Sequence, residues 1–125
     1  MNRRILLSGL FGVCLLAGCL SPTLPLPPPE EPTTISESPT PGVWSVSGTC
    51  TQGAMVLIRD ERTGVIAGGE DRLHTGHYAI QVQAQECDTA TVFEVVEDNV
   101  SGGTSFLIRA VVGGVAQNNC SGTDP

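Results

Sequence analysis

The sequence predicts an all-β protein, built around one small antiparallel β-sandwich of about six to seven strands. Apolar and polar residues alternate with a period of two over several segments after residue 42, which is typical of strands that bury one face. Polar clusters that contain glycine separate these segments and predict turns. After the first nineteen residues, no stretch of ten residues shows a helical period. A chain of 125 residues allows one small domain at most.

The N-terminal residues have the features of an export signal. Arg3 and Arg4 precede a twelve-residue apolar stretch, 5–16, which is too short to cross ~30 Å of hydrocarbon. Residues 16–19 then read Leu-Ala-Gly-Cys and resemble the lipobox of bacterial lipoproteins. The resemblance implies a signal peptide over 1–18, cleavage between Gly18 and Cys19, and acyl chains such as palmitate on Cys19.

Acyl chains on Cys19 imply that the mature protein is anchored to a membrane without spanning it. Each buried methylene contributes ~0.8 kcal/mol, so several chains hold a protein almost permanently. Leu20 stands where enterobacterial lipoproteins kept at the inner membrane carry aspartate, so the resemblance favours the outer membrane of a Gram-negative host. The side of that membrane stays open. The alternative is an ordinary signal peptide with a coincidental cysteine.

Residues 19–42 are predicted to form a linker after the lipidated cysteine. Eight of the nine prolines lie between residues 20 and 42. Proline fixes φ and removes a backbone donor, so we expect polyproline II at ~3.1 Å per residue, without strands. Fully extended, such a segment reaches roughly 70 Å. We interpret it as a stalk, and a proline-motif ligand for a partner is the alternative.

The folded domain is predicted over residues 43–116, followed by a polar tail over 117–125. Segments 54–59 and 91–97 are apolar on both faces and predict interior strands. Segments 44–50, 77–84 and 105–112 alternate strictly, and the segment 65–68 is short. Turns are expected over 49–53, 60–64 and 98–103. The six expected strands cover 44–50, 54–59, 65–68, 77–84, 91–97 and 105–112. By their alternation, all four aromatic residues of this region are expected in the core.

Two strings in this region resemble a known class of module. Residues 46–56 fit the pattern Val-x-Gly-x-x-x-x-Gly-Ala-x-Val, and a Thr-Gly turn follows at 63–64. Residues 75–82 read Thr-Gly-His-Tyr-Ala-Ile-Gln-Val and match the next element apart from its usual aspartate. The strings resemble the opening of bacterial Ig-like and carboxypeptidase-regulatory-like modules, over roughly residues 43–112. The resemblance implies an Ig-like sandwich, and such modules serve mostly as spacers, adhesive units and binding platforms.

Three cysteines of the domain, Cys50, Cys87 and Cys120, are disulfide candidates because export places them under oxidising conditions. Closing 50 to 87 or 87 to 120 encloses loops of similar length, worth ~4 kcal/mol each. Counting strand reversals places Cys87 and Cys120 at the same end, whereas an extra short strand near residues 72–73 would favour Cys50 with Cys87. We slightly favour the 50–87 pairing, because Cys120 lies in the polar tail. The odd thiol is either free or bridges two molecules.

We expect no cofactor and no metal. His74 and His77 are the only histidines and the weak candidates for a transition-metal site, but no third strong ligand is near them in sequence. The acidic pairs at 70–71, 86/88 and 97–98 fall in predicted loops, where calcium is conceivable. No Asp-x-Asp-x-Asp-Gly register is present, so we interpret these carboxylates as solvated.

Composition limits the function further. Six basic against thirteen acidic residues give a net charge of −7, which argues against a nucleic-acid partner. The sequence has no Gly-x-Ser-x-Gly elbow and no lysine, so we expect no enzyme. The main hypothesis is a lipid-anchored envelope protein that presents its domain to a protein partner. The alternative is a module that binds glycan, peptidoglycan or calcium, although carbohydrate sites need exposed aromatic residues, which are scarce here.

Overall fold

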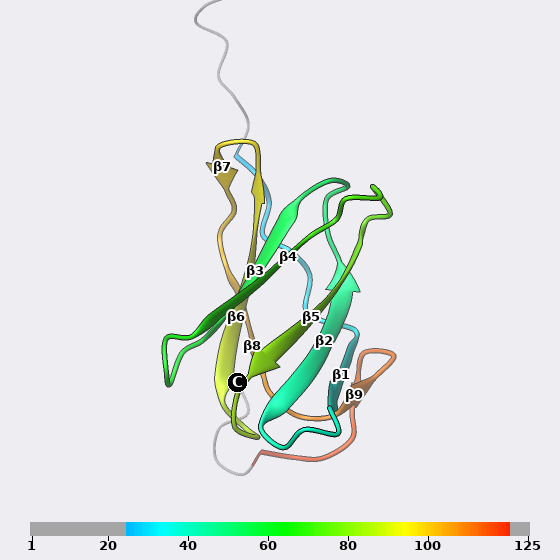
Figure 1. Cartoon of the computed structure of the whole chain (residues 1–125), viewed down its shortest axis with the longest axis vertical. Coiled ribbons are helices and arrows are strands. Elements are labelled where there is room, and N and C mark those ends of the chain that lie inside the picture. The colour runs from blue at the N-terminus through cyan, green and yellow to red at the C-terminus, as the bar shows by residue number, and fades with distance from the viewer. Residues whose placement is uncertain (1–24, 121–125) are drawn as a thin grey trace, which may run out of the picture.

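The computed structural model describes residues 25–120, which form ten strands and no helix (Figure 1). The predicted all-β sandwich is confirmed, since the strands form two antiparallel sheets. Within the described residues, no helical segment could cross a bilayer. The predicted signal peptide, Gly18 and Cys19 lie outside the described residues. The strands are β1 Thr34–Glu37, β2 Val43–Thr49, β3 Met55–Asp60, β4 Ile66–Glu70, β5 His77–Gln83, β6 Thr89–Val96, β7 Asn99–Val100, β8 Thr104–Leu107, β9 Val111–Val112 and β10 Val115–Ala116.

The strands are divided between a first sheet of order β10-β9-β1-β2-β5 and a second of order β4-β3-β6-β7, in which β8 also pairs with β6. β3 and β6 are interior strands, as their two apolar faces predict. β5 ends the first sheet and β4 ends the second, and the two splay apart from the 71–76 loop that joins them (Figure 1). Each sheet therefore has a long strand at its edge on this side of the sandwich.

The core lies between the sheets, where each long strand points every second side chain inward. In β5 the pattern is perfect: Tyr78, Ile80 and Val82 are buried and their neighbours are exposed. Tyr78 lies flat over Gly48, where a Cβ would come within 2.6 Å of the phenol oxygen. The core includes Ile35, Trp44, Val46, Val56, Ile58, Tyr78, Ile80, Val82, Ala84, Ala90, Val92, Phe106 and Ile108.

Phe93 corrects one expectation, because it does not join the core with the other three aromatic residues. It lies half-buried on the outer face of the second sheet, opposite Leu57 of β3. The guanidinium of Arg59 lies 5.7 Å from the centroid of its ring. Strand β6 is apolar on both faces, so its alternation alone does not determine which face is inward.

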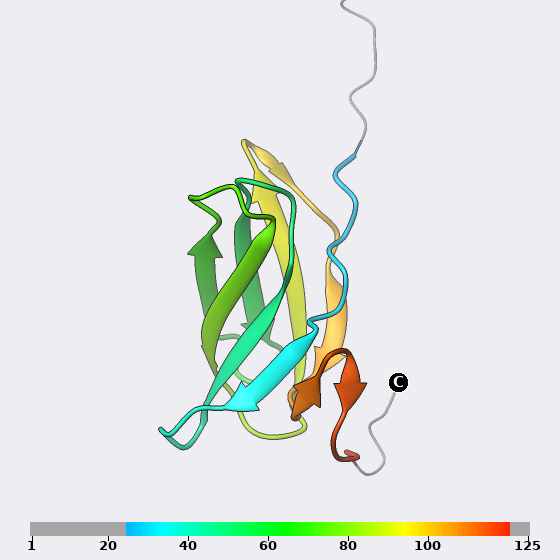
Figure 2. The ribbon, with the colours of Figure 1, turned by 90° about the vertical axis from the view of Figure 1, so that its right-hand side faces the viewer.

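The segment predicted as a linker contains a strand. β1 pairs with β2 over four residues, and its Ile35 is almost completely buried. Residues 33–37 contain no proline, so their backbone donors are available, and Thr33 and Thr34 favour extended structure. Pro29 and Pro32 are buried too, and the Pro29 carbonyl accepts a hydrogen bond from Thr104 of β8. Residues 25–33 thus run beside β8 (Figure 2), and the folded domain begins well before residue 43.

The expected strand over 105–112 is two strands in different sheets. β8 pairs with β6, and β9 then pairs with β1 across the sandwich. Between them Ile108 exchanges backbone hydrogen bonds with the β5–β6 loop, accepting from Cys87 and donating to Asp88. Phe106, Leu107 and Ile108 are therefore buried in succession, which breaks the alternation that the sequence suggested. β10 ends at the predicted boundary of the domain, residue 116, and the disulfide at Cys120 extends the fold into the predicted tail.

Candidate functional site

Among the three cysteines of residues 25–120, the structure pairs Cys87 with Cys120 in a disulfide and leaves Cys50 as a free thiol. The favoured 50–87 pairing is therefore wrong. Residues 72–73 form no strand, so the extra strand that would have favoured Cys50 with Cys87 is absent. Cys120 is 1 % exposed rather than part of a solvated tail. A disulfide across 33 residues adds stability to a domain too small to gain much from its core alone.

Cys50 is half-buried at the end of β2 and packs against the core. Burial, with the charges of Asp71 and Glu94, raises the pKa of its thiol to about 11. A thiol that stays protonated at neutral pH is a poor nucleophile and exchanges slowly with disulfides. Cys50 therefore suits a packing role better than a reactive one.

The two histidines are not brought into a metal-ligand cluster. His77 is exposed at the start of β5, whereas His74 has a positive φ of 54° and packs its ring against the backbone of Gly53. A Cβ at Gly53 would lie 2.7 Å from the imidazole Cε1 of His74. Across residues 25–120, no group of three histidine, cysteine or acidic side chains is placed to hold a metal ion. The structure therefore gives His74 a role in loop packing.

Asp71, one of the loop carboxylates considered for calcium, binds backbone groups instead. Its Oδ2 accepts hydrogen bonds from the N–H groups of Gly76 at 2.8 Å and Gly53 at 3.1 Å. Its Oδ1 accepts from the N–H and the hydroxyl of Thr75, both at 3.0 Å. These donors, led by Gly76, lower the pKa of Asp71 to about 2. Asp71 therefore fastens the β2–β3 turn to the β4–β5 loop.

Asp60 and Asp88 form a second carboxylate site at the opposite end of the sandwich. Oδ1 of Asp88 accepts from the Arg62 guanidinium at 2.9 Å, and its Oδ2 accepts from the N–H of Gln85 at 2.9 Å. Burial opposes the ionisation of Asp88, but the hydrogen bond from Arg62 and further donors lower its pKa. Burial, and then the contact with Asp88, raises the pKa of Asp60. The surroundings therefore disfavour the charged form of Asp60 and favour that of Asp88.

The edge of β5 exposes backbone groups that no strand within the described part of the chain pairs. Ala84 donates its N–H to Gly42 at 3.0 Å, and the Gly76 carbonyl accepts from Cys50 at 2.9 Å, so even-numbered residues point toward β2. In an antiparallel ladder the alternate residues point the other way. The N–H and C=O groups of Ala79, Gln81 and Gln83 therefore face outward, since β5 is the last strand of its sheet. We call these three residues the β5 edge.

The backbone of His77 points in the same direction but is engaged. Its N–H donates to the Thr75 hydroxyl at 3.2 Å, and that hydroxyl lies 3.5 Å from its carbonyl. His77 is therefore left out of the β5 edge, although its backbone groups face the same way.

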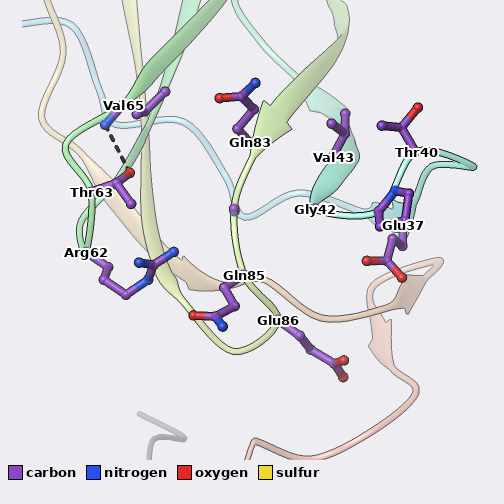
Figure 3. Close-up of a pocket in the computed structure, with 12 residues that line it drawn as sticks. Glu37, Thr40, Gly42, Val43, Arg62, Thr63, Val65, Gln83, Gln85 and Glu86 are labelled. Carbon is purple, nitrogen blue, oxygen red and sulfur yellow. Dashed lines mark hydrogen bonds between the residues drawn. The ribbon is translucent and has the colours of Figure 1, made fainter.

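Two cavities lie along β5. The larger, of about 720 Å³, is lined by residues 83–86 together with the β1–β2 and β3–β4 turns. Figure 3 shows Glu37 and Glu86 on one side of it and Arg62 on the other. The smaller cavity, of about 260 Å³, lies between the end of β4 and residues 77–80. Both cavities are open spaces on the side where the two sheets splay apart.

Periodicity had predicted β5 itself but not its position at an edge, since alternation is the same in edge and central strands. The signal that distinguishes them is the order of strands in the sheet, which depends on β1 and β2 pairing far from β5.

The chain matches no family model, no curated protein and no solved structure in the comparisons made.

Proposed function

We propose that this chain is a lipid-anchored protein of the cell envelope, held at the outer membrane, that presents its sandwich to a protein partner and catalyses no reaction. The observation that carries the proposal is the β5 edge, with unpaired backbone groups and open space beside it. Uncovered edges are surfaces on which other polypeptides pair.

The lipobox resemblance of residues 16–19 supports the anchor. The Cys87–Cys120 disulfide supports export, because such bonds persist in oxidising compartments. Cleavage before Cys19 would leave four arginines and thirteen acidic residues, a net charge of −9. That charge makes attachment through a basic patch unfavourable and leaves acylation as the means of anchoring.

The alternative of a glycan-binding module has less support. Sugar rings stack on exposed aromatic faces, and Trp44, Tyr78 and Phe106 are each under 8 % exposed. Phe93 lies on the surface, but Arg59 is placed over its ring. We therefore keep the protein partner as the proposed function.

The anchor is tested by Cys19→Ala, with Cys14→Ala as the matched control because Val13 precedes Cys14 where a lipobox has a small residue. We expect Cys19→Ala to lose labelling by a radioactive or alkynyl palmitate and to leave the membrane fraction, while Cys14→Ala keeps both. Density-gradient separation of the two membranes tests the outer-membrane location. A Cys19→Ala protein that stays acylated and membrane-bound would show that the proposal is wrong.

A further inference from the structure

We propose that the β5 edge binds an extended segment of a partner protein by strand addition, and that a basic side chain of this segment lies between Glu37 and Glu86. The inference rests on the proposed interaction role and adds the surface and the chemistry of the partner. Backbone hydrogen bonds would supply affinity, and the acidic cavity would supply specificity.

The backbone geometry is that of an unprotected edge. Proteins usually protect long edge strands with proline, lysine, a bulge or a covering segment. β5 is seven residues long and pairs regularly with β2 along its whole length, and it contains neither proline nor lysine. The side chains of Ala79, Gln81 and Gln83 are exposed and uncharged, so they do not oppose an incoming strand.

β4 offers a weaker edge on the same side of the molecule. It has five residues, and its centre contains Gly68 and Gly69, which weaken a strand because their backbone loses more entropy on ordering. The other sheet ends, β7 and β10, contain two residues each, and the four-residue β8 has residues 25–33 running beside it. β5 is therefore the strand on which a partner segment gains the most backbone hydrogen bonds.

The charge at one end of β5 points to a basic partner. Glu37 and Glu86 both line the larger cavity, and neither forms an ion pair within the described residues. Glu86 accepts only an amide hydrogen bond, from Asn118 at 2.7 Å. Arg62, the basic residue of this cavity, already donates to Asp88. An arginine or lysine entering beside Gln83 would meet two unpaired carboxylates, and arginine can bind a carboxylate through two donors.

The test selects peptides from a displayed library of random decapeptides on the full chain purified in mild detergent. We expect the selected peptides to be rich in β-branched residues and to share an arginine or lysine. When the peptide binds, the amides of Ala79, Gln81 and Gln83 should exchange hydrogen more slowly, while those of β10 at the far side of the same sheet should be unchanged.

Two variants separate backbone pairing from charge. Gln81→Pro removes an N–H that points away from β2, so the hydrogen bonds between β2 and β5 are kept. The peptide loses one backbone donor, and its affinity should fall roughly tenfold. The double variant Glu37→Gln with Glu86→Gln should lower the affinity for basic peptides roughly fivefold and leave the affinity for neutral peptides unchanged. The matched control is Glu97→Gln with Asp98→Asn, which neutralises two exposed carboxylates at the β6–β7 turn. Circular dichroism should show that all variants keep the fold.

The inference is overturned if selection enriches no peptide over the Gln81→Pro protein, or if the selected peptides protect amides elsewhere. A photo-crosslinking residue placed in intact cells at Gln81 or at Met55, on the outer face of the second sheet, distinguishes the two proposals. Adducts from Met55 alone would refute strand addition at β5 and leave an interaction role standing. Adducts from neither position, with Cys19→Ala still membrane-bound, would refute the proposed function itself.

Discussion

The two ends of the sandwich are held together by different chemistry. At one end, which we call the Asp71 end, Asp71 and Glu94 bind the loops through backbone hydrogen bonds, Glu94 by accepting from the N–H of Thr51 at 3.0 Å. At the other, the Asp88 end, a disulfide joins residues 87 and 120, and Asp88 shares its environment with a second buried carboxylate, Asp60.

The difference shows that the number of available donors decides what a buried aspartate does. Asp71 receives hydrogen bonds from three N–H groups and one hydroxyl, so its charged form is stabilised. Asp60 receives one hydrogen bond, from the N–H of Arg62 at 3.0 Å, and its Oδ2 is buried without a donor. The charged form of Asp71 is therefore more stable than that of a free aspartate, whereas burial makes the charged form of Asp60 less stable.

The largest effect is expected from removing the covalent link at the Asp88 end. Replacing Cys87 and Cys120 together with serine should cost about 4 kcal/mol of unfolding free energy, because the unfolded chain regains the entropy of a 33-residue loop. Denaturant unfolding measures the loss, and Cys50→Ser, which removes a thiol outside the disulfide, is the control. Equal stability of the oxidised wild type and the double variant, or peptide mapping that finds Cys50 in the bond, would contradict the structure.

At the Asp71 end, Asp71→Asn should lower the melting temperature by roughly 10 °C, because an amide cannot accept from all the donors around it. Glu70→Gln is the control, since Glu70 is exposed and lies 3.5 Å from Arg72 on the surface. Because the pKa of Asp71 is lowered to about 2 in the folded state, its contribution is present above pH ~4 and is lost as the pH falls from there toward 2. A melting temperature unchanged at pH 7 would show that the loops are held without this carboxylate.

The smallest effect, and one of opposite sign, is expected at Asp60. Its folded pKa is raised, so the folded state binds the proton more tightly, and stability falls as the pH rises from ~4 through that raised value. Asp60→Asn imitates the protonated form: its oxygen still accepts from Arg62, and its amide donates to Asp88. We expect a gain of up to about 1 kcal/mol at pH 7 and a flatter pH profile. Calorimetric melting from pH 3 to 8 measures both, and a marked loss of stability at pH 7 would contradict the raised pKa of Asp60.

Local pattern was sufficient to locate the long strands. Alternation located β2 and β5, and runs that are apolar on both faces located β3 and β6, each within a few residues, because burial of one or two faces leaves a direct record in the sequence. It missed β1 because prolines on both sides hid a short proline-free run that pairs only when β2 is next to it. It also joined β8 to β9, since the change of sheet at Ile108 depends on backbone contacts with residues 87 and 88.

The candidate site was beyond reach of local pattern for a similar reason. The sequence drew attention to His74, His77 and the acidic pairs because their side chains carry chemistry. The β5 edge consists of backbone groups, which every residue has, and only the order of strands leaves those of Ala79, Gln81 and Gln83 unpaired.

By itself, the sequence determined the all-β class, the long strands and the candidate cysteines, since these follow from composition and from a period that spans a few residues. The tertiary structure alone decided which cysteines meet, which aspartate keeps its charge and which strand ends a sheet. Each of these depends on distances between residues far apart in the chain. Such distances are set by the packing of two sheets around a common core, to which no short segment has access.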